Sequence, residues 1–219
     1  MLIEHEGKRP DIASSAYVAE TAVVCGDVRI RPDSRVLFGA VVTADGGPVE
    51  IGSRSIVMEN AVIRARERHP VRLGDHVLVG PHAHLNGVTV EDDVFIATGV
   101  SAFPGAHLER EVEARINSII HVNTRVACGT HIPIGWIAVG DPAELFAPDR
   151  VDDYWPKLKQ LDFPGTLFGI AREDLTMEKL TSIYVELFGR HRDDLLLIDA
   201  LPKTEQSPAN RVAPTPRAP

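Results

Sequence analysis

An aliphatic residue returns at every sixth position through most of this chain, and this repeat constrains the fold more than any other feature. The repeated positions are Val18, Val24, Ile30, Val36, Val42, Ile51, Val57, Ile63, Leu73, Val79, Leu85, Val90, Ile96, Ala102, Leu108, Ala114, Ile120, Val126 and Ile132. A period of six fits neither an α-helix, with about 3.6 residues per turn, nor an amphipathic strand, which alternates. It fits short strands joined by tight turns, in which each strand turns one aliphatic side chain inward. We therefore predict a mainly β solenoid whose stacked coils bury these residues.

Composition argues against several classes of partner. The chain has 219 residues and a formal net charge of −8, which disfavours nucleic acid and anionic membrane surfaces as partners. No apolar run reaches the length of a bilayer span, and Met1–Pro10 has no apolar core of the signal-peptide kind. The cysteines, Cys25 and Cys128, form neither a disulfide framework nor a CxxC zinc motif. We therefore expect a soluble cytoplasmic protein.

Two interruptions of the repeat predict loops on one side of the solenoid, where insertions often form a binding face. The first, Thr43–Glu50, contains Gly46 and Gly47, which permit a tight turn. The second begins with Arg-Ala-Arg-Glu-Arg-His-Pro at residues 64–70, a basic stretch in an acidic protein. It is either an ordinary solvated loop or a rim that attracts anions to a neighbouring pocket, and the sequence leaves both interpretations open.

The repeat ends near residue 132, and we predict a β-helix domain over residues 1–143 and a C-terminal part over residues 144–201. Within that part, the aromatic-containing residues 149–173 are expected to be an irregular segment that packs on the solenoid or covers a pocket. An amphipathic helix is expected over Thr176–Gly189, with its apolar stripe against one flat face of the solenoid. This stripe consists of Leu180, Ile183, Tyr184, Leu187 and Phe188. Residues 202–219, rich in Pro and Ala, are expected to be disordered.

Three stretches resemble the γ-class carbonic anhydrase family: Val42–Gly52 (VTADGGPVEIG), Leu73–Gly87 (LGDHVLVGPHAHLNG) and Val139–Ala143 (VGDPA). The run Tyr184–Leu187 also resembles the last helix of that family. The resemblance covers roughly residues 12–143 together with this helix. It implies a hexapeptide-repeat, left-handed parallel β-helix with a C-terminal α-helix packed along it. It also implies a homotrimer with a ligand site between adjacent subunits.

The resemblance further implies a zinc ion held by three histidines, but the corresponding positions here are Arg64, Pro81 and Asn86. Zinc with an open position lowers the pKa of its bound water toward ~7, so that hydroxide can attack carbon dioxide. Arginine does not deprotonate to become a ligand, and proline has no donor atom in its side chain. We therefore predict that the standard zinc site cannot form, that CO2 hydration activity is lost, and that no metal cofactor is bound.

Residues around these positions make up the candidate pocket. The family's loop aspartate is retained as Asp45, whereas its loop arginine corresponds to Thr43 and its glutamine–aspartate pair to Met58-Glu59. The candidate catalytic residues are Arg64, His82, His84, Asn86 and Tyr184, and the candidate substrate-binding residues are Asp45, Glu59 and Arg64.

Each candidate has an expected role and an ordinary alternative. Arg64 either captures an anionic substrate or forms an ion pair at a subunit interface. His82 or His84 is expected to transfer protons, and Asn86 and Tyr184 to form hydrogen bonds with a substrate. A zinc site displaced onto His82 and His84 is the weaker interpretation, because both are more simply explained as interface or surface histidines.

Three functions, one of them non-enzymatic, stay open at this point. The first is a carbonic-anhydrase-like protein whose pocket serves a small substrate, an anion for example, or assembly. The second is a hexapeptide-repeat acyltransferase that uses an acyl-CoA, with His107, His121 or His131 as the base. Glu144 replaces a lysine common to both groups, and these acidic surroundings disfavour binding of CoA phosphates. The third is a binding scaffold without chemistry.

Overall fold

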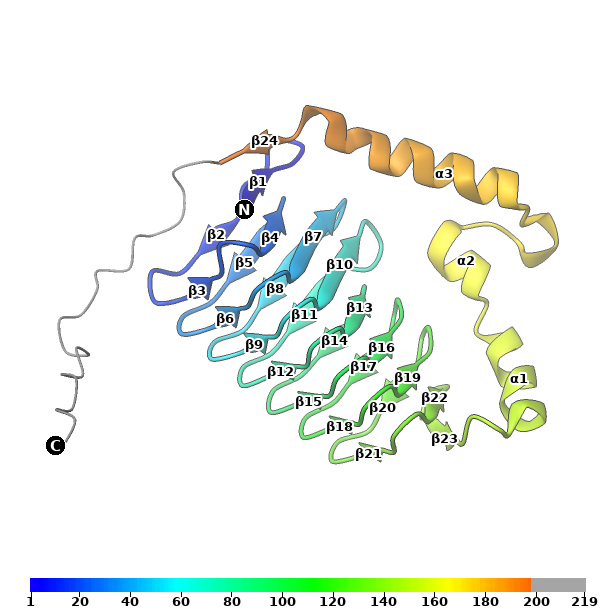
Figure 1. Cartoon of the computed structure of the whole chain (residues 1–219). Helices are drawn as coiled ribbons and strands as arrows, with labels where there is room; N and C mark the ends of the chain where they lie inside the picture. The colour runs from blue at the N-terminus through cyan, green and yellow to red at the C-terminus, as the bar shows by residue number, and fades with distance from the viewer. Residues whose placement is uncertain (198–219) are drawn as a thin grey trace, which may run out of the picture.

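The computed structural model of this protein describes residues 1–197, which form a solenoid of three parallel sheets and a C-terminal extension (Figure 1). The ten-stranded sheet holds β1 (Leu2–Glu4), β4 (Val23–Cys25), β7 (Val41–Asp45), β10 (Val62–Arg66), β13 (His84–Asn86), β16 (Ser101–Ala102), β19 (Ile119–Ile120), β22 (Ile137–Val139), β23 (Glu144–Phe146) and β24 (Leu195–Leu196). A seven-stranded sheet holds β2 (Asp11–Ile12), β5 (Val28–Ile30), β8 (Val49–Ile51), β11 (Val71–Leu73), β14 (Thr89–Val90), β17 (His107–Leu108) and β20 (Arg125–Val126). The other seven-stranded sheet holds β3 (Tyr17–Val18), β6 (Arg35–Val36), β9 (Ile56–Val57), β12 (Leu78–Val79), β15 (Phe95–Ile96), β18 (Glu113–Ala114) and β21 (His131–Ile132).

The core of the solenoid consists of the repeated aliphatic residues. Each of them lies in its own strand, and Val18, at 7% exposed, is the most accessible. The small residues beside them lie at the corners, where Ser34 donates to the carbonyl of Gly52 (2.6 Å) and Ser55 to that of Gly74 (2.8 Å), whereas the buried hydroxyl of Ser118 has no partner. The predicted left-handed parallel β-helix is therefore confirmed, because the period of six sets both strand length and inward residue.

The two interruptions of the repeat lengthen two strands of the ten-stranded sheet. β7 and β10 each have 5 residues and pair along their whole length, so that Asp45 lies opposite Arg66. The second loop turns back at once, since the backbones of Arg66 and His69 exchange two hydrogen bonds. Gly47 passes so close that a Cβ there would collide with the carbonyl oxygen of Arg66. The extended ends of β7 and β10 form a ledge beyond the rest of the sheet.

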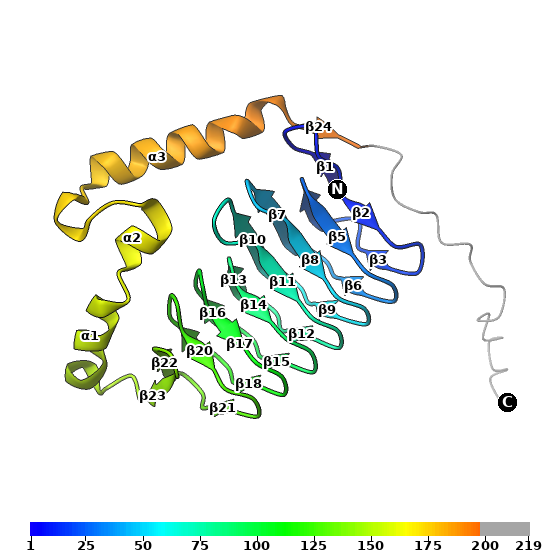
Figure 2. The ribbon, with the colours of Figure 1, turned by 180° about the vertical axis from the view of Figure 1, so that it is seen from behind.

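The C-terminal extension runs from the last coil back to the first, as Figures 1 and 2 both show. It contains α1 (Val151–Gln160), α2 (Phe163–Phe168), the 3-10 turn η1 (Arg172–Asp174), α3 (Met177–Gly189) and the 3-10 turn η2 (Arg190–Asp193). The expectation of an irregular segment over residues 149–173 is wrong, because α1 and α2 lie there. None of the helices in residues 1–197 is long and apolar enough to cross a membrane. The tail expected to be disordered, 202–219, lies outside the described residues.

The predicted amphipathic helix is α3, and Thr176 caps it by accepting a hydrogen bond from the backbone of Lys179 (3.2 Å). The helix packs along the solenoid, but it lies over the ledge rather than flat on a sheet (Figure 2). Its apolar stripe meets the outward arginines of β10, and no residue of α3 is fully buried. The stripe faces the solenoid as predicted, yet it contacts charged side chains because the ledge raises them toward it.

Candidate functional site

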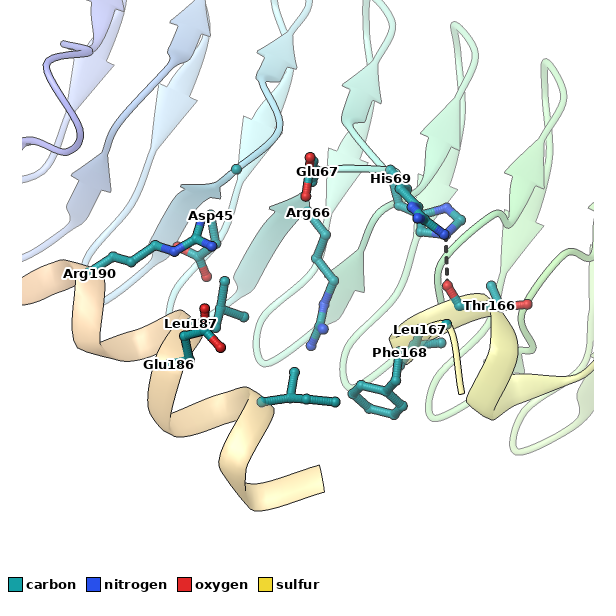
Figure 3. A pocket seen from close by; sticks show the side chains of 14 residues that line it. Asp45, Arg66, Glu67, His69, Thr166, Leu167, Phe168, Glu186, Leu187 and Arg190 are labelled. Atoms are coloured by element: carbon teal, nitrogen blue, oxygen red, sulfur yellow. Dashed lines mark hydrogen bonds between the residues drawn. The ribbon is translucent and has the colours of Figure 1, made fainter. Parts of the chain in front are cut away.

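A pocket of about 420 Å³ lies between the ledge and the helices of the C-terminal extension (Figure 3). The lining side chains come from the ledge (Asp45, Arg66, Glu67, Arg68, His69), from α2 and its end (Thr166, Leu167, Phe168) and from α3 and its end (Ile183, Glu186, Leu187, Arg190). The wall is half polar: cationic and acidic groups stand on the ledge and at the end of α3, and apolar groups come from both helices. The pocket could therefore hold a small molecule with one charged and one apolar part.

Asp45 is paired rather than free. Its side chain is 2% exposed, and its Oδ2 lies 3.2 Å from Nε of Arg64 and accepts a hydrogen bond from Thr43 (3.4 Å). The other oxygen, Oδ1, lies 3.3 Å from Nε2 of His191 but has no hydrogen-bond donor. Arg64 is further held over the ring of Phe188, 5.2 Å from its centroid. The guanidinium of Arg64 therefore balances a buried carboxylate of its own chain, whereas the interpretation from sequence placed such a pair at a subunit interface.

Arg66 is the cation that reaches into the pocket (Figure 3). It is 9% exposed, its Nη2 donates to the hydroxyl of Tyr184 (3.1 Å), and its guanidinium lies against the rings of Tyr184 (5.4 Å) and Phe168 (5.9 Å). Its Nε is buried without a hydrogen-bond acceptor. Within residues 1–197, no carboxylate lies within 4.0 Å of its nitrogens. A buried cation in this state is suited to receive an anion from solution.

The helix α2 is fixed over the pocket by Thr166. The ring of His69 shares a hydrogen bond between Nε2 and the carbonyl of Thr166 (3.2 Å), so that Nε2 carries the proton. Asn123 donates to the hydroxyl of the same threonine (2.9 Å). These bonds join α2 to the ledge and to a later coil, and they keep Phe168 beside Arg66.

His84 and Asn86 lie on β13, next to the arginines of β10. Asn86 is the register partner of Arg64, is 6% exposed, and has a buried amide oxygen without a donor. Burial lowers the pKa of His84, and the charges of Arg64 and Arg66 lower it further. At neutral pH this imidazole is therefore neutral, and it can accept a proton only weakly.

The chain is similar in sequence to curated γ-class and other carbonic anhydrases. The chain is 32% identical over 144 residues to the mitochondrial γ carbonic anhydrase 1 of Arabidopsis thaliana, which covers 63% of this chain and 50% of the relative. It is 30% identical over 99 residues to the carbonic anhydrase of Geobacillus kaustophilus, covering 45% of this chain and 54% of the relative. In sequence the chain is similar to γ carbonic anhydrases, and its solenoid is consistent with a γ-carbonic-anhydrase-like hexapeptide-repeat protein. It spans about half the length of these curated relatives.

Solved structures agree on the fold of this γ-carbonic-anhydrase-like chain. A hexapeptide transferase family protein from Anaplasma phagocytophilum superposes with a TM-score of 0.50 and 21% identity, over 74% of this chain and 92% of the other. At this level of identity the similarity shows the solenoid fold and supports no inference about a substrate. No family profile matches the sequence.

The family's metal positions fall on two separate parts of the γ-carbonic-anhydrase-like chain. Arg64 and Asn86 lie side by side, but Pro81 stands in the turn before β13. Glu59 lies in the equivalent turn before β10, and the exposed His82 donates its backbone N–H to the carbonyl of Glu59 (3.1 Å). Glu59 and Arg64 are five positions apart, at most ~17 Å along an extended chain. Within one chain, Glu59 and His82 are thus not brought to the pocket, whereas Asp45, Arg64 and Tyr184 lie at or beside it.

Sequence reasoning included Arg66 in the basic stretch 64–70 but did not single it out as a site residue, although a signal was present. In a strand, residues two apart face the same side, and the six-residue repeat predicted that Ile63 points inward. Arg64 and Arg66 therefore had to share the outer face, but the length of β10 could not be foreseen from the repeat.

The histidines considered as acyl-transfer bases are dispersed over the surface. His107 lies 2.8 Å from Glu91 and His131 lies 3.6 Å from Glu113, both outside the pocket. His121 packs against Phe103 and Phe163, and burial lowers its pKa. Of the three, His107 alone has a carboxylate at hydrogen-bonding distance, but it lies outside the pocket, so none of them is brought to the pocket as a base.

Proposed function

We propose that this chain is a γ-carbonic-anhydrase-like protein without CO2 hydration activity, whose ledge pocket binds a small monoanion such as a carboxylate. The observation that carries the proposal is Arg66: a buried cation aimed into the pocket, with an unpartnered Nε and, in residues 1–197, no carboxylate oxygen within 4.0 Å of its nitrogens. A carboxylate can add two parallel hydrogen bonds to such a guanidinium.

The donor set at the inherited metal positions supports the loss of zinc chemistry. Arg64 is a cation that pairs with Asp45, and its guanidinium does not coordinate zinc. Pro81 offers no side-chain donor, and Asn86 alone does not make a three-ligand site. These residues do not fit a zinc ion, so no hydration step is assigned to them.

The remaining lining narrows the class of ligand. Arg64 balances Asp45. The other charged side chains of the lining are two glutamates and three arginines (Glu67, Glu186, Arg66, Arg68 and Arg190), which leave one net positive charge. One such charge suits a monoanion better than the several phosphates of CoA. Ile183, Leu187 and Phe168 offer an apolar wall. The proposed ligand therefore carries a single negative charge and a short apolar part.

We also propose that the chain works as a cytoplasmic homotrimer, with the ledge near a subunit interface. The resemblance to γ carbonic anhydrases supports the trimer, and the half-exposed stripe of α3 leaves apolar surface that a neighbouring subunit could cover. Native mass spectrometry of the untagged protein tests it, and a monomer at micromolar concentration contradicts it.

The experiment for the proposed function combines stopped-flow CO2 hydration with calorimetric titration of propionate. We expect no hydration above the uncatalysed rate, and propionate binding that Arg66→Met weakens by about 10-fold to 100-fold, since hydrogen bonds to a buried charge are lost. The matched control is Arg72→Met, which removes an exposed arginine of β11. Hydration at an enzymatic rate overturns the first part of the proposal. Equal propionate affinity in wild type and Arg66→Met overturns the second.

A further inference from the structure

A second cluster of polar side chains lies beside the ledge, where the extension returns to the first coil. His5 follows β1, Cys25 ends β4, and His191 and Asp194 lie in and just after η2. One donor atom from each of the four side chains lies within 4.8 Å of all the others. Asp194 is central: its oxygens lie 2.6 Å from Nδ1 of His5 and 2.8 Å from Nδ1 of His191. The Sγ of Cys25 lies 3.7 Å from Oδ2 of the same aspartate.

We propose that His5, Cys25, His191 and Asp194 bind one zinc ion, or a similar divalent cation that accepts nitrogen and sulfur ligands. A thiolate, two imidazoles and a carboxylate form a donor set typical of tetrahedral zinc. In such a site the donors lie roughly 3.3–3.8 Å apart, so the carboxylate of Asp194 must move outward slightly on binding. The inference departs from the sequence-based expectation of no metal, which considered only positions near His82 and His84.

Burial and charge both favour a closed structural site. His5 is 4% exposed and Cys25 is 3% exposed, so neither can meet a substrate. A divalent cation displaces the thiol proton to solvent, and with one thiolate, one carboxylate and two neutral imidazoles the site has no net charge.

The second nitrogen of His191 already has the partner that a metal-bound imidazole usually has. Metal-binding histidines typically donate their other N–H to a carboxylate, which fixes the ring. Nε2 of His191 lies 3.3 Å from the buried Oδ1 of Asp45, the oxygen that lacks a hydrogen-bond donor. A small rotation of the ring onto a cation at Nδ1 aligns this N–H with the carboxylate. The orphaned oxygen of Asp45 is thus an independent observation that points to the same site.

The backbone holds the donors together independently of any ion. β24 pairs antiparallel with β1, with Glu4 opposite Leu195, and so places Asp194 next to His5. β1 pairs in parallel with β4, with Ile3 opposite Cys25. A cation at this junction joins the first coil to the end of α3 and closes a loop of more than a hundred residues, which is where a cross-link constrains the unfolded chain most. The cation also holds His191 against Asp45. Through Asp45 it supports the ion pair between Asp45 and Arg64.

The test uses the full-length, untagged protein after removal of metal with a chelator. Cobalt(II) is titrated as a spectroscopic substitute for zinc, and bound zinc is measured by elemental analysis. We expect one ion per chain, a thiolate-to-cobalt charge-transfer absorption, and a melting temperature that rises with metal concentration. Cys25→Ser should lose this absorption, and both Cys25→Ser and His191→Gln should weaken binding by at least about 100-fold, more than loss of an outer partner does. Cys128→Ser, which removes the exposed cysteine, is the matched control and should bind as wild type does.

A second measurement on the wild type guards against misfolding of the variants. Alkylation of Cys25 should be slow in the metal-loaded protein and faster after chelation, while Cys128 reacts in both states. No stoichiometric cobalt or zinc, or equal binding by wild type and Cys25→Ser, overturns the proposal. These readouts are independent of propionate affinity and CO2 hydration, so the site can fail while the proposed function stands, and the reverse.

Discussion

Nε of Arg64 lies 3.2 Å from Oδ2 of Asp45, so a cation at an inherited metal position faces a carboxylate that the family retains. The pair joins two neighbouring strands, β10 and β7, at the base of the ledge. Because Asp45 is buried, its carboxylate needs the charge of Arg64 for the stability of the fold. The charge of Arg64 is therefore already neutralised and is not free for a ligand.

Removal of one partner of this pair should therefore destabilise the fold. Arg64→Met leaves the carboxylate of Asp45 with only His191 and the hydroxyl of Thr43 nearby. We expect a loss of about 1–3 kcal/mol in the free energy of unfolding, less than for a fully buried pair because Arg64 is part-exposed. Urea unfolding of Arg64→Met, Asp45→Asn and the double variant measures the coupling. If the double variant loses the sum of the single losses, the two side chains do not interact.

Tyr184 is expected to act on anions through Arg66. Tyr184→Phe removes the hydroxyl that accepts from Nη2 of Arg66 but keeps the ring below the guanidinium. We expect propionate affinity to fall by about threefold to tenfold, since the guanidinium loses one of its orienting hydrogen bonds. Calorimetry measures this, and Tyr154→Phe, on α1, is the control. A loss as large as that of Arg66→Met would mean that the hydroxyl binds the anion itself.

The titration of His84 should lie on the acid side of its ordinary value. Burial lowers its pKa, with Arg64 and Arg66 contributing, so its NMR titration midpoint should fall below 6.5. Arg66→Met should raise the midpoint but leave it below 6.5, because burial remains, whereas Arg72→Met should not move it. The unfolded chain then binds more protons than the folded chain, so this histidine's contribution to stability decreases as pH falls from 6.5 toward the folded pKa. A midpoint above 6.5 contradicts the assignment.

The solenoid core should respond locally to a cavity. Leu108 is fully buried in β17, and Leu108→Ala should cost about 2–5 kcal/mol. Hydrogen exchange should rise most in β14 and β20, the two strands that pair with β17, because coils contact only their neighbours. Ile134→Ala, at a side chain that is 62% exposed, is the control and should change stability by less than about 0.5 kcal/mol. An even rise of exchange over all coils would argue against nearest-neighbour cooperation.

Prediction from sequence worked where structure follows from local period and failed where it depends on distant contacts. Val24, Ile96 and the other repeated residues were placed correctly, because one strand of fixed length surrounds each of them. The helices α1 and α2 were missed, since α1 has no buried residue and Pro156 lies inside it, and α2 has only 6 residues. Val151, Tyr154, Trp155 and Leu158 of α1 do have the i, i+3, i+4, i+7 spacing of an amphipathic helix, so this signal was present and was overlooked, whereas α2 is too short to show one.

The candidate site shows the same division. Asp45, Arg64 and Tyr184 were recognised through a family resemblance, and they lie together. Arg66 was not singled out because the extra length of β10 comes from its pairing with β7. The cluster of His5 with Asp194 joins residues 189 positions apart, and only the pairing of β24 with β1 brings them within reach.

β23 and β24 occupy the opposite edges of the ten-stranded sheet, so the length of the extension between them has to match the length of the solenoid. Nine strand spacings of about 4.8 Å require it to bridge roughly 43 Å, and α3, with 13 residues, supplies about 20 Å of that as a rigid rod. Insertion of one more coil would move β24 away from β1. Deletion of one coil would leave the extension longer than the distance it has to span above the ledge. The length of the extension therefore limits the number of coils, in addition to the hexapeptide pattern. Duplication of a coil in this chain would require a matching change in residues 147–194.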